Sequence, residues 1–307
     1  MEIFKVISKN ISVIFKNNKK FDWSKTHAWV PTPVDLYNDN IKVLYGSRNK
    51  KNLTQTGYFV YNLKKRKIIF NSKKPILKLG NTGEFDDSLS LVTSCLRLKS
   101  QLYLYFVGWI IPKNTRFFPS VGVAKSNLSF SKVKKHKKPI MDRNVKESLG
   151  FASPFILSKK KQFFMWYVAI RKWIKNKSDL IPIYNLSYGV SKDGINWKYK
   201  KKEILKTKKN ETISRPWIIF HKKKYHMWYS YRELGKKFKI GYATSSDGIK
   251  WHRRDKELKI PIKKGFNDQM SEYPAFFNHK NKFFLLFNGN DYGKTGVGLV
   301  EMNYGKK

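Results

Sequence analysis

Acidic side chains next to apolar, strand-like segments are the first candidates for chemistry in this sequence. Asp87 follows Asp86 in GEFDDS, Glu211 lies just ahead of SRPWIIF, and Glu272 opens EYPAFF. A carboxyl group beside a buried strand can exchange a proton with a bound ligand when its surroundings shift its pKa. Structural roles compete with this chemistry, because Asp87 could cap a turn and Glu211 could form a surface ion pair with the lysine-rich loop before it.

Arginines mark the ends of similar segments. Arg215 begins the apolar run RPWIIF, while Arg48 and Arg232 end the runs KVLYGSR and MWYSYR. A guanidinium held at the end of a buried strand needs an anionic partner, either inside the protein or in a ligand. The carboxylates that could pair with Arg215 inside the fold are Glu211, Asp268 and Glu272. If the anionic partner belongs to a ligand instead, the three arginines would bind a phosphate or a sugar carboxylate in bidentate fashion.

Further polar residues at the ends of apolar runs are candidates for ligand contact. They are His27 in THAWVP, Tyr273 in EYPAFF, and Asn288, Asn290, Tyr292 and Lys294 in FNGNDYGKTGVG. The Gly-Lys-Thr of the last segment does not make a P-loop, because Gly289 stands one residue too close to Gly293 and a strand pattern follows. The six histidines are scattered, with no metal-ligand spacing. We therefore predict no metal and no cofactor.

A repeat of about 60 residues runs through the chain and positions these candidates. Each unit has an apolar run, a lysine-rich turn, an aromatic strand, a loop and a third strand, and in most units proline opens the first run. The positions that mark the five first strands are Pro31, Thr93, Pro154, Pro216 and Pro274. The turns SKDGINW and SSDGIKW place turn-forming Asp193 and Asp247 ahead of a fourth strand, which Trp197 and Trp251 open.

Five such units predict an all-β fold, a five-bladed β-propeller with four-stranded antiparallel blades. A β-sandwich or a pair of β domains is the alternative. We expect one domain over residues 1–307, with residues 1–20 as a peripheral or closing segment, and only residues 1–18 show helical periodicity. The inner strand of each propeller blade lines a central channel, so residues that flank the first and second strands are the best site candidates.

The net charge of +43, from 64 basic and 21 acidic residues, suggests nucleic acid at first sight. The lysines are spread along the whole chain, which argues against nucleic acid as the main partner and favours a solvated surface. The field could still attract anionic ligands or an acidic membrane face. A single cysteine, Cys95, fits a reducing compartment, and no signal-peptide core or membrane-spanning run is present. We expect a cytoplasmic protein.

Several of these segments together resemble a known group of proteins. The aromatic repeats, the DGIxW turns, GEFDDS, SRPW with MWYSYR, and EYPAFF with NGNDYGKTGVG are similar to bacterial proteins related to the five-bladed glycoside hydrolases of families 43, 32 and 68, over residues 21–303. Such hydrolases use a nucleophile or base, an orienting aspartate and a glutamate acid. The Glu-Tyr-Pro at Glu272 is similar to the Glu-Gly-Pro of family 43, although it lies in the last repeat. The aspartate expected before the first proline is missing, because Val30 precedes Pro31.

The resemblance implies a carbohydrate-active protein that acts on a glycosyl bond, by hydrolysis or transfer. The three arginines add the expectation of an anionic or activated sugar, which fits surface-glycan metabolism. Asp87 and Glu272 are then the expected carboxylate pair, with Glu211 in reserve, and the partner is a carbohydrate or a nucleotide sugar. The expected substrate-binding residues are His27, Arg48, Asp86, Arg215, Arg232, Tyr273, Asn288, Asn290, Tyr292 and Lys294. The sequence leaves open whether the protein is an enzyme, and the alternative is a non-catalytic sugar-binding propeller without a carboxylate pair.

Overall fold

The computed structural model describes residues 2–113, 115–144, 148–176 and 179–306, and nearly all of its regular elements are β-strands. Two short helical turns accompany them, η1 (Asp255–Glu257) and α1 (Asn290–Gly293). Within the described ranges, no helix has the length and apolar character needed to cross a membrane. The prediction of an all-β fold is confirmed.

Consecutive antiparallel strands build two separate four-stranded sheets in the second half of the chain, as the repeat predicts. One sheet contains β11 (Phe151–Lys159), β12 (Gln162–Asn176), β13 (Asp179–Ser191) and β14 (Trp197–Lys201). The other contains β15 (Glu211–His221), β16 (Lys224–Glu233), β17 (Lys239–Ser245) and β18 (His252–Arg253).

An eight-stranded sheet precedes them and consists of two four-stranded antiparallel groups. The first group is β3 (Thr26–Tyr37), β4 (Asn40–Arg48), β5 (Thr54–Asn62) and β6 (Lys67–Asn71). The second group is β7 (Leu89–Leu98), β8 (Gln101–Ile110), β9 (Phe118–Asn127) and β10 (Val133–Lys135). One parallel residue pair, Thr54 with Leu89, connects the two groups through β5 and β7.

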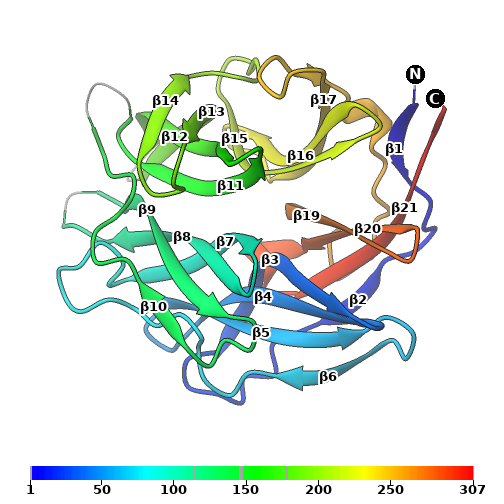
Figure 1. The fold of residues 1–307 in the computed structure, drawn as a ribbon, viewed down its shortest axis with the longest axis horizontal. Coiled ribbons are helices and arrows are strands. Elements are labelled where there is room, and N and C mark those ends of the chain that lie inside the picture. Colours follow the sequence, from blue (N-terminus) through cyan, green and yellow to red (C-terminus); the bar gives the residue numbers. More distant parts are fainter. Residues whose placement is uncertain (1, 114, 145–147, 177–178, 307) are drawn as a thin grey trace.

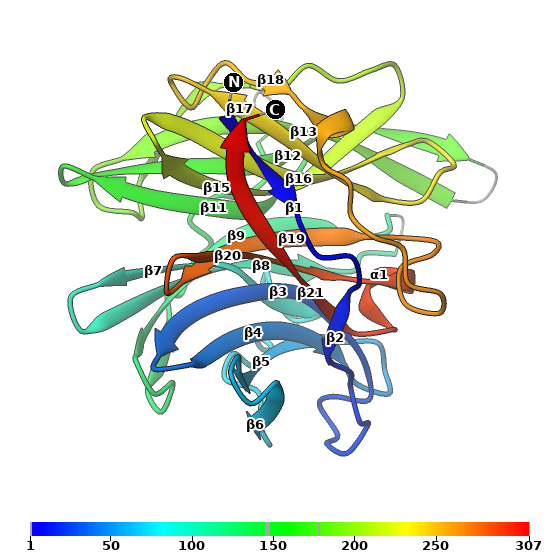
Figure 2. The ribbon, with the colours of Figure 1, turned by 90° about the vertical axis from the view of Figure 1, so that its right-hand side faces the viewer.

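The last sheet joins the two ends of the chain. Its strands are β1 (Glu2–Val6), β2 (Ser12–Phe15), β19 (Glu272–His279), β20 (Lys282–Asn288) and β21 (Val297–Lys306). The strands β1 and β21 lie side by side and antiparallel, as Figure 2 shows. The helical spacing of residues 1–18 is therefore misleading, because pairing with β21 buries Phe4 and Phe15 in the core of a sheet.

The first strands of the five groups form a closed ring (Figure 1). In the order β3, β7, β11, β15 and β19, each strand contacts the next, and β19 contacts β3. Four of these strands have a register shift at a residue followed by proline, and the four residues have positive φ angles. They are Val30 (54°), Ser153 (45°), Arg215 (50°) and Tyr273 (55°).

The expectation that these prolines open their strands is wrong. β15, for example, begins at Glu211, so Pro216 lies well inside it. A β-bulge leaves one residue of the strand unpaired, and this accommodates a proline that has no N–H for the ladder. Each left-handed residue costs roughly 1–3 kcal/mol, and all four lie on strands of the ring.

The two DGIxW turns form as predicted. One carboxylate oxygen of Asp193, and likewise of Asp247, accepts hydrogen bonds from the backbone N–H groups two and three residues ahead, at 2.8–2.9 Å. Gly194 and Gly248 follow at φ 76°, a value that suits glycine. Both aspartates are turn residues, and β14 starts at Trp197 as expected.

Candidate functional site

A small cavity of about 150 Å³ lies where the beginnings of β3, β11, β15 and β19 meet, and we call it the central pocket. The bulged strands bring Trp29, Ser153, Ser214 and Tyr273 to its wall. The aromatic residues that line it are Trp29, Trp109, Phe117, Tyr184, Phe238, Tyr273 and Tyr292, and the arginines are Arg48, Arg116 and Arg232. No carboxylate lines it in the described parts of the chain.

Two of the predicted arginines, Arg48 and Arg232, lie in this wall against aromatic faces. The Arg48 guanidinium lies 5.0 Å from the ring centroid of Trp29, and that of Arg232 lies 4.5 Å from the ring centroid of Phe238. Arg232 also donates a long hydrogen bond of 3.4 Å to the Tyr292 hydroxyl. Burial lowers the pKa of Arg48, while the site as a whole remains positively charged because guanidinium groups stay protonated. The pocket therefore offers aromatic surfaces and positive charge to a ligand.

Glu272 lies next to the pocket wall and is completely buried. Neither of its carboxylate oxygens has a hydrogen-bond partner in the described part of the chain. Burial raises the pKa of Glu272 to about 8, against a smaller lowering effect of the Tyr273 hydroxyl and of Arg232. The Tyr273 hydroxyl is near enough to oppose this rise in pKa slightly, but the pair does not meet the geometry of a hydrogen bond. Glu272 is therefore mostly a neutral carboxylic acid at pH 7.

Arg215 is also completely buried, and its role differs from that of the two wall arginines. Its Nη2 donates hydrogen bonds to the carbonyl oxygen of Pro31 at 3.2 Å and to the Thr32 hydroxyl at 3.1 Å, which links β15 to β3. Burial lowers its pKa to about 9, so it stays charged at neutral pH. No ion pair of Arg215 with Glu211, Asp268 or Glu272 occurs among the ion pairs between described residues, so the predicted internal partners do not hold it.

The other predicted carboxylates are bound elsewhere and do not line the central pocket. Glu211 accepts two hydrogen bonds from Arg253, at 2.6 and 2.9 Å. Asp86 is buried in an ion pair with Lys135. Asp87 accepts hydrogen bonds from the Gly83 N–H at 3.0 Å and from the Ser88 hydroxyl at 2.7 Å, which is the turn-capping role that competes with a catalytic one.

The remaining predicted residues surround the loop that contains α1. The side-chain oxygen of Asn288 accepts a hydrogen bond from the Val30 N–H at 3.2 Å. The side-chain oxygen of Asn290 accepts hydrogen bonds from the backbone N–H groups of Gln269 and Met270, at 3.0 and 2.9 Å. Both side-chain amides therefore bind backbone groups. Lys294 is exposed. Left-handed backbone at the neighbouring residue Tyr292 (φ 55°) places that ring in the pocket wall.

His27 lies near the same loop, at a left-handed position of β3. Burial lowers the pKa of its imidazole to about 4, and the positive charges of Arg48 and Lys294 contribute to this shift. The ring is therefore neutral at pH 7, and it does not line the central pocket.

Sequence reasoning missed most of the aromatic wall. Trp29, Ala152 and Ser214 line the pocket, and each stands two residues before a proline of the repeat, as Glu272 does. Their position in the repeat was the signal that could have identified them. Arg116 and Phe117 lie in the irregular loop between β8 and β9, where the repeat gives no guide.

Partnerless polar groups concentrate around the pocket. Buried polar atoms without a hydrogen-bond partner in the described structure include Trp29 Nε1, Trp109 Nε1, Ser214 Oγ, Arg215 Nε and Nη1, and both Glu272 oxygens. Buried polar atoms are normally satisfied by protein or water, so such a cluster marks a place for water or a ligand. Among the described residues, no group of three metal-ligating side chains is present.

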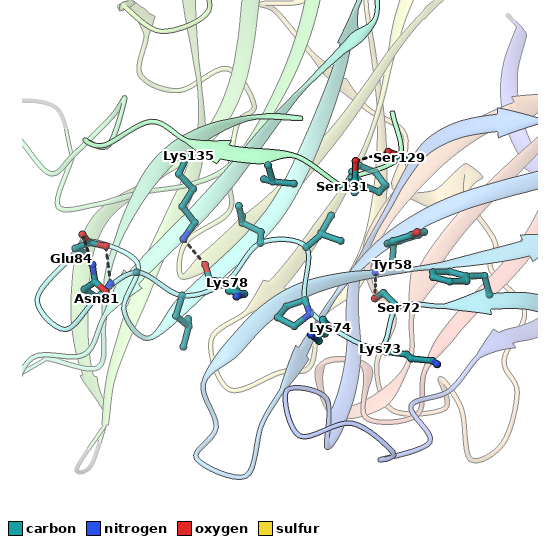
Figure 3. Close-up of a pocket in the computed structure, with 18 residues that line it drawn as sticks. Tyr58, Ser72, Lys73, Lys74, Lys78, Asn81, Glu84, Ser129, Ser131 and Lys135 are labelled. Carbon is teal, nitrogen blue, oxygen red and sulfur yellow. Dashed lines mark hydrogen bonds between the residues drawn. The ribbon is translucent and has the colours of Figure 1, made fainter. Parts of the chain in front are cut away.

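A larger hollow of about 870 Å³ lies at the outer edge of the molecule, between β6 and β10 (Figure 3). Lysines and aromatic rings line it, including Lys73, Lys74 and Phe70. Figure 3 shows Lys135 turned to the carbonyl oxygen of Lys78, and Lys135 also pairs with Asp86. No described residue that lines this hollow has a partnerless buried polar atom, so the central pocket is the better candidate site.

Comparison of the sequence with known proteins identifies relatives that are themselves uncharacterised. No family model matches the chain. An uncharacterised protein of Mycobacterium tuberculosis, Rv1502, is 28% identical over 296 residues, which cover 95% of this chain and 98% of that protein. Because this relative is uncharacterised, it does not indicate the function of this chain.

Solved structures of glycoside hydrolases share the fold at low sequence identity. A glycoside hydrolase superposes with a TM-score of 0.76 at 15% identity, over 97% of this chain and 92% of its own. A glycosyl hydrolase from Bacteroides ovatus has a TM-score of 0.69 at 16% identity, over 97% and 92%. A thermostable family-43 glycoside hydrolase has a TM-score of 0.66 at 15% identity, over 94% and 92%. The chain therefore has the β-propeller fold of these glycoside hydrolases, as its sequence resemblance implied.

Proposed function

We propose that this protein is a carbohydrate-active propeller whose central pocket binds an anionic sugar ring. The observation that carries the proposal is the wall of Arg48 and Arg232 on aromatic faces, with no lining carboxylate in the described chain. Aromatic side chains can pack against the apolar face of a sugar, and arginine suits a carboxylate or phosphate group. The glycoside hydrolase fold of the structural relatives supports a carbohydrate as the ligand.

We further propose that the propeller has five blades in one domain. The closed ring of β3, β7, β11, β15 and β19 supports this count. So does the construction of the eight-stranded sheet, which divides into two antiparallel groups of four that meet through one residue pair. On this interpretation, β1 completes the last blade beside β21.

Binding fits the pocket better than two-carboxylate hydrolysis does. Glycosidases place two carboxyl groups on opposite sides of the scissile bond, and they lie roughly 5–10 Å apart. Here Asp87 and Glu211 are held outside the pocket, and of the three predicted catalytic carboxylates only Glu272 adjoins a lining residue, Tyr273. The neutral state of Glu272 at pH 7 favours a second candidate, in which Glu272 donates a proton to the leaving group in glycosyl transfer or hydrolysis.

Calorimetric titration with glucuronic acid, glucose 1-phosphate and neutral glucose tests the binding proposal. We expect at least one of the two anionic sugars to bind and glucose to bind at least about tenfold more weakly. Arg48→Met and Arg232→Met keep most of the side-chain bulk but remove the charge, and each should weaken binding of the anionic sugar about tenfold or more.

Arg66→Met is the matched control, because Arg66 is exposed in the turn between β5 and β6. It should bind the anionic sugar as the wild type does. Equal affinity for glucose and the anionic sugars, no binding of any of them, or wild-type affinity in both wall variants would contradict the proposal.

A further inference from the structure

A second hollow of about 630 Å³ lies beside the central pocket, and we call it the side pocket. The residues of its lining that matter here are Phe118, Asp142, Arg143, Asn144, Trp173 and Tyr199. Three of these residues are aromatic, and the Arg143 guanidinium lies 4.4 Å from the ring centroid of Phe118. The side pocket thus combines aromatic rings with polar side chains, as the central pocket does.

The two pockets share a wall. Arg116 and Phe117 line the central pocket, while Thr115 and Phe118, on either side of them in the sequence, line the side pocket. Successive side chains point to opposite faces of an extended chain, and this explains why Phe117 and Phe118 face different pockets. Residues 115–118, at the end of the β8–β9 connection and the start of β9, therefore contribute to the linings of both hollows.

An aromatic chain crosses this wall. The ring of Phe117 stacks on Trp109 in the central pocket, with centroids 4.3 Å apart and planes 9° apart. Phe117 also makes an edge contact with Trp173 of the side pocket, with centroids 5.5 Å apart. A series of packed aromatic rings thus connects the linings of the two hollows.

The hairpin of β12 and β13 supplies the second half of the wall. These strands have 15 and 13 residues and are the longest in the fold. Trp173 pairs with Pro182 across the hairpin, and Pro182 lines the central pocket while Trp173 lines the side pocket. The longest hairpin of the molecule therefore reaches both hollows.

We propose that the side pocket is a subsite for the next ring of an oligosaccharide whose anionic ring occupies the central pocket. This inference rests on the proposed function and narrows its ligand class from an anionic sugar to an acidic oligosaccharide. The central pocket, at about 150 Å³, is small for a ligand site, so a longer ligand must extend beyond it. Trp173 offers a ring for sugar packing. Asp142 accepts hydrogen bonds from the Ser120 hydroxyl and the Arg143 N–H on its Oδ1, and its second carboxylate oxygen offers an acceptor for a sugar hydroxyl group.

Chain-length dependence of binding tests the subsite. The probes are glucuronic acid alone, glucuronic acid linked to one, two or three neutral sugars, and neutral oligosaccharides of the same lengths. We expect an affinity gain of about tenfold or more when the first neutral ring is added. Trp173→Ala should abolish this gain, and any loss of affinity for glucuronic acid alone through the lost contact with Phe117 should be much smaller than the gain that is abolished.

Two further variants control for structural damage. Trp173→Phe retains an aromatic ring and should keep most of the gain, and Tyr37→Ala removes an aromatic side chain that is 73% exposed on β3 and should keep all of it. Thermal unfolding of all variants shows whether they are folded.

The outcomes separate the two proposals. If glucuronic acid binds through Arg48 and Arg232 but longer chains bind no better, or Trp173→Ala keeps the gain, the subsite is overturned and the proposed function stands. If neutral chains gain affinity through Trp173 without any preference for the acidic ring, the subsite stands and the anionic specificity is overturned. Absence of binding by every probe overturns both.

Discussion

One position of the repeat, two residues before the proline, supplies much of the site. It is occupied by Trp29, Ala152, Ser214 and Glu272, so the same backbone location holds an indole, a methyl group, a hydroxyl group and a carboxyl group. Three of these side chains line the central pocket and the fourth is buried beside it. A β-bulge follows each of these four residues on a strand of the ring. Because the backbone location is equivalent in all four strands, the chemical difference between them comes from the side chain.

The buried carboxyl group of Glu272 makes stability depend on pH. Burial raises its pKa from the ordinary value of 4.5 to about 8, so between these values the folded chain keeps a proton that the unfolded chain loses. The free energy of unfolding should therefore fall as the pH rises from about 4.5 to about 8, by up to about 1.4 kcal/mol per pH unit from this group. Glu272→Gln cannot titrate and should lack this contribution.

Urea unfolding of the wild type and of Glu272→Gln at pH 5, 6.5 and 8 measures the difference. The stability of the variant relative to the wild type should rise steadily across the series. Glu233→Gln is the control, because Glu233 forms a surface ion pair with Lys236 and its pKa is lowered rather than raised. A constant difference between the wild type and Glu272→Gln would show that Glu272 is already ionised at pH 5.

At the scale of the elements, the lysine-rich turns are unusual in composition. The two-residue turns Lys160–Lys161, Lys222–Lys223 and Lys280–Asn281 connect the first and second strands of three sheets, and all six residues have positive φ angles of 47–63°. Such turns match the twist of a β-hairpin but strongly favour Asn and Gly. Lysine at these positions strains the backbone, and its charge keeps the turns in solvent.

Replacement of one turn lysine should therefore stabilise the protein. At Lys223 (φ 62°), glycine adopts the left-handed conformation without steric cost, whereas alanine pays the same backbone penalty as lysine. We expect Lys223→Gly to be more stable than Lys223→Ala by about 1 kcal/mol in urea unfolding. Because both variants remove the same charge, the comparison isolates the backbone effect. Equal stability would mean that the turn is not left-handed in solution.

At the scale of the whole molecule, the N-terminal strand closes the structure. Phe4 on β1 is fully buried and lies within 5.5 Å, between ring centroids, of six aromatic or imidazole rings. These rings come from β15, β16, β19, β20 and β21. The backbone N–H of Phe4 also donates a hydrogen bond to the Tyr242 hydroxyl on β17, at 3.2 Å. A residue near the end of the chain thus connects the last two sheets.

Phe4→Ala should consequently destabilise the whole fold, by about 3–5 kcal/mol in the free energy of unfolding. Ile7→Ala is the matched control, since Ile7 is 54% exposed just after the same strand and should change stability by less than about 0.5 kcal/mol. Denaturant unfolding followed by tryptophan fluorescence reports on both. A small effect of Phe4→Ala would mean that β1 is peripheral rather than part of the core.

The sequence by itself determined the all-β class, the strand repeat and the Asp-Gly turns. It also singled out Arg48, Arg232, Tyr273 and Tyr292, which line one pocket, while their role in ligand binding stays a prediction. These features depend on alternation, turn chemistry and repeat position, which are local properties of the chain. It misplaced the prolines at strand starts because a bulge is defined by the partner strand as well as by its own residues.

Tertiary structure decided which charges meet. The sequence presented Glu211 as a candidate acid, but in the fold its carboxylate is bound by Arg253. The sequence presented Arg215 as a candidate anion binder, but in the fold its guanidinium donates to the Pro31 carbonyl oxygen and the Thr32 hydroxyl. The aromatic wall, with Trp109 and Phe117 from a loop without repeat signal, likewise exists only when distant segments converge. Ion pairs and pocket walls join residues tens to hundreds of positions apart, and their energy depends on distance and burial, which a one-dimensional pattern does not contain.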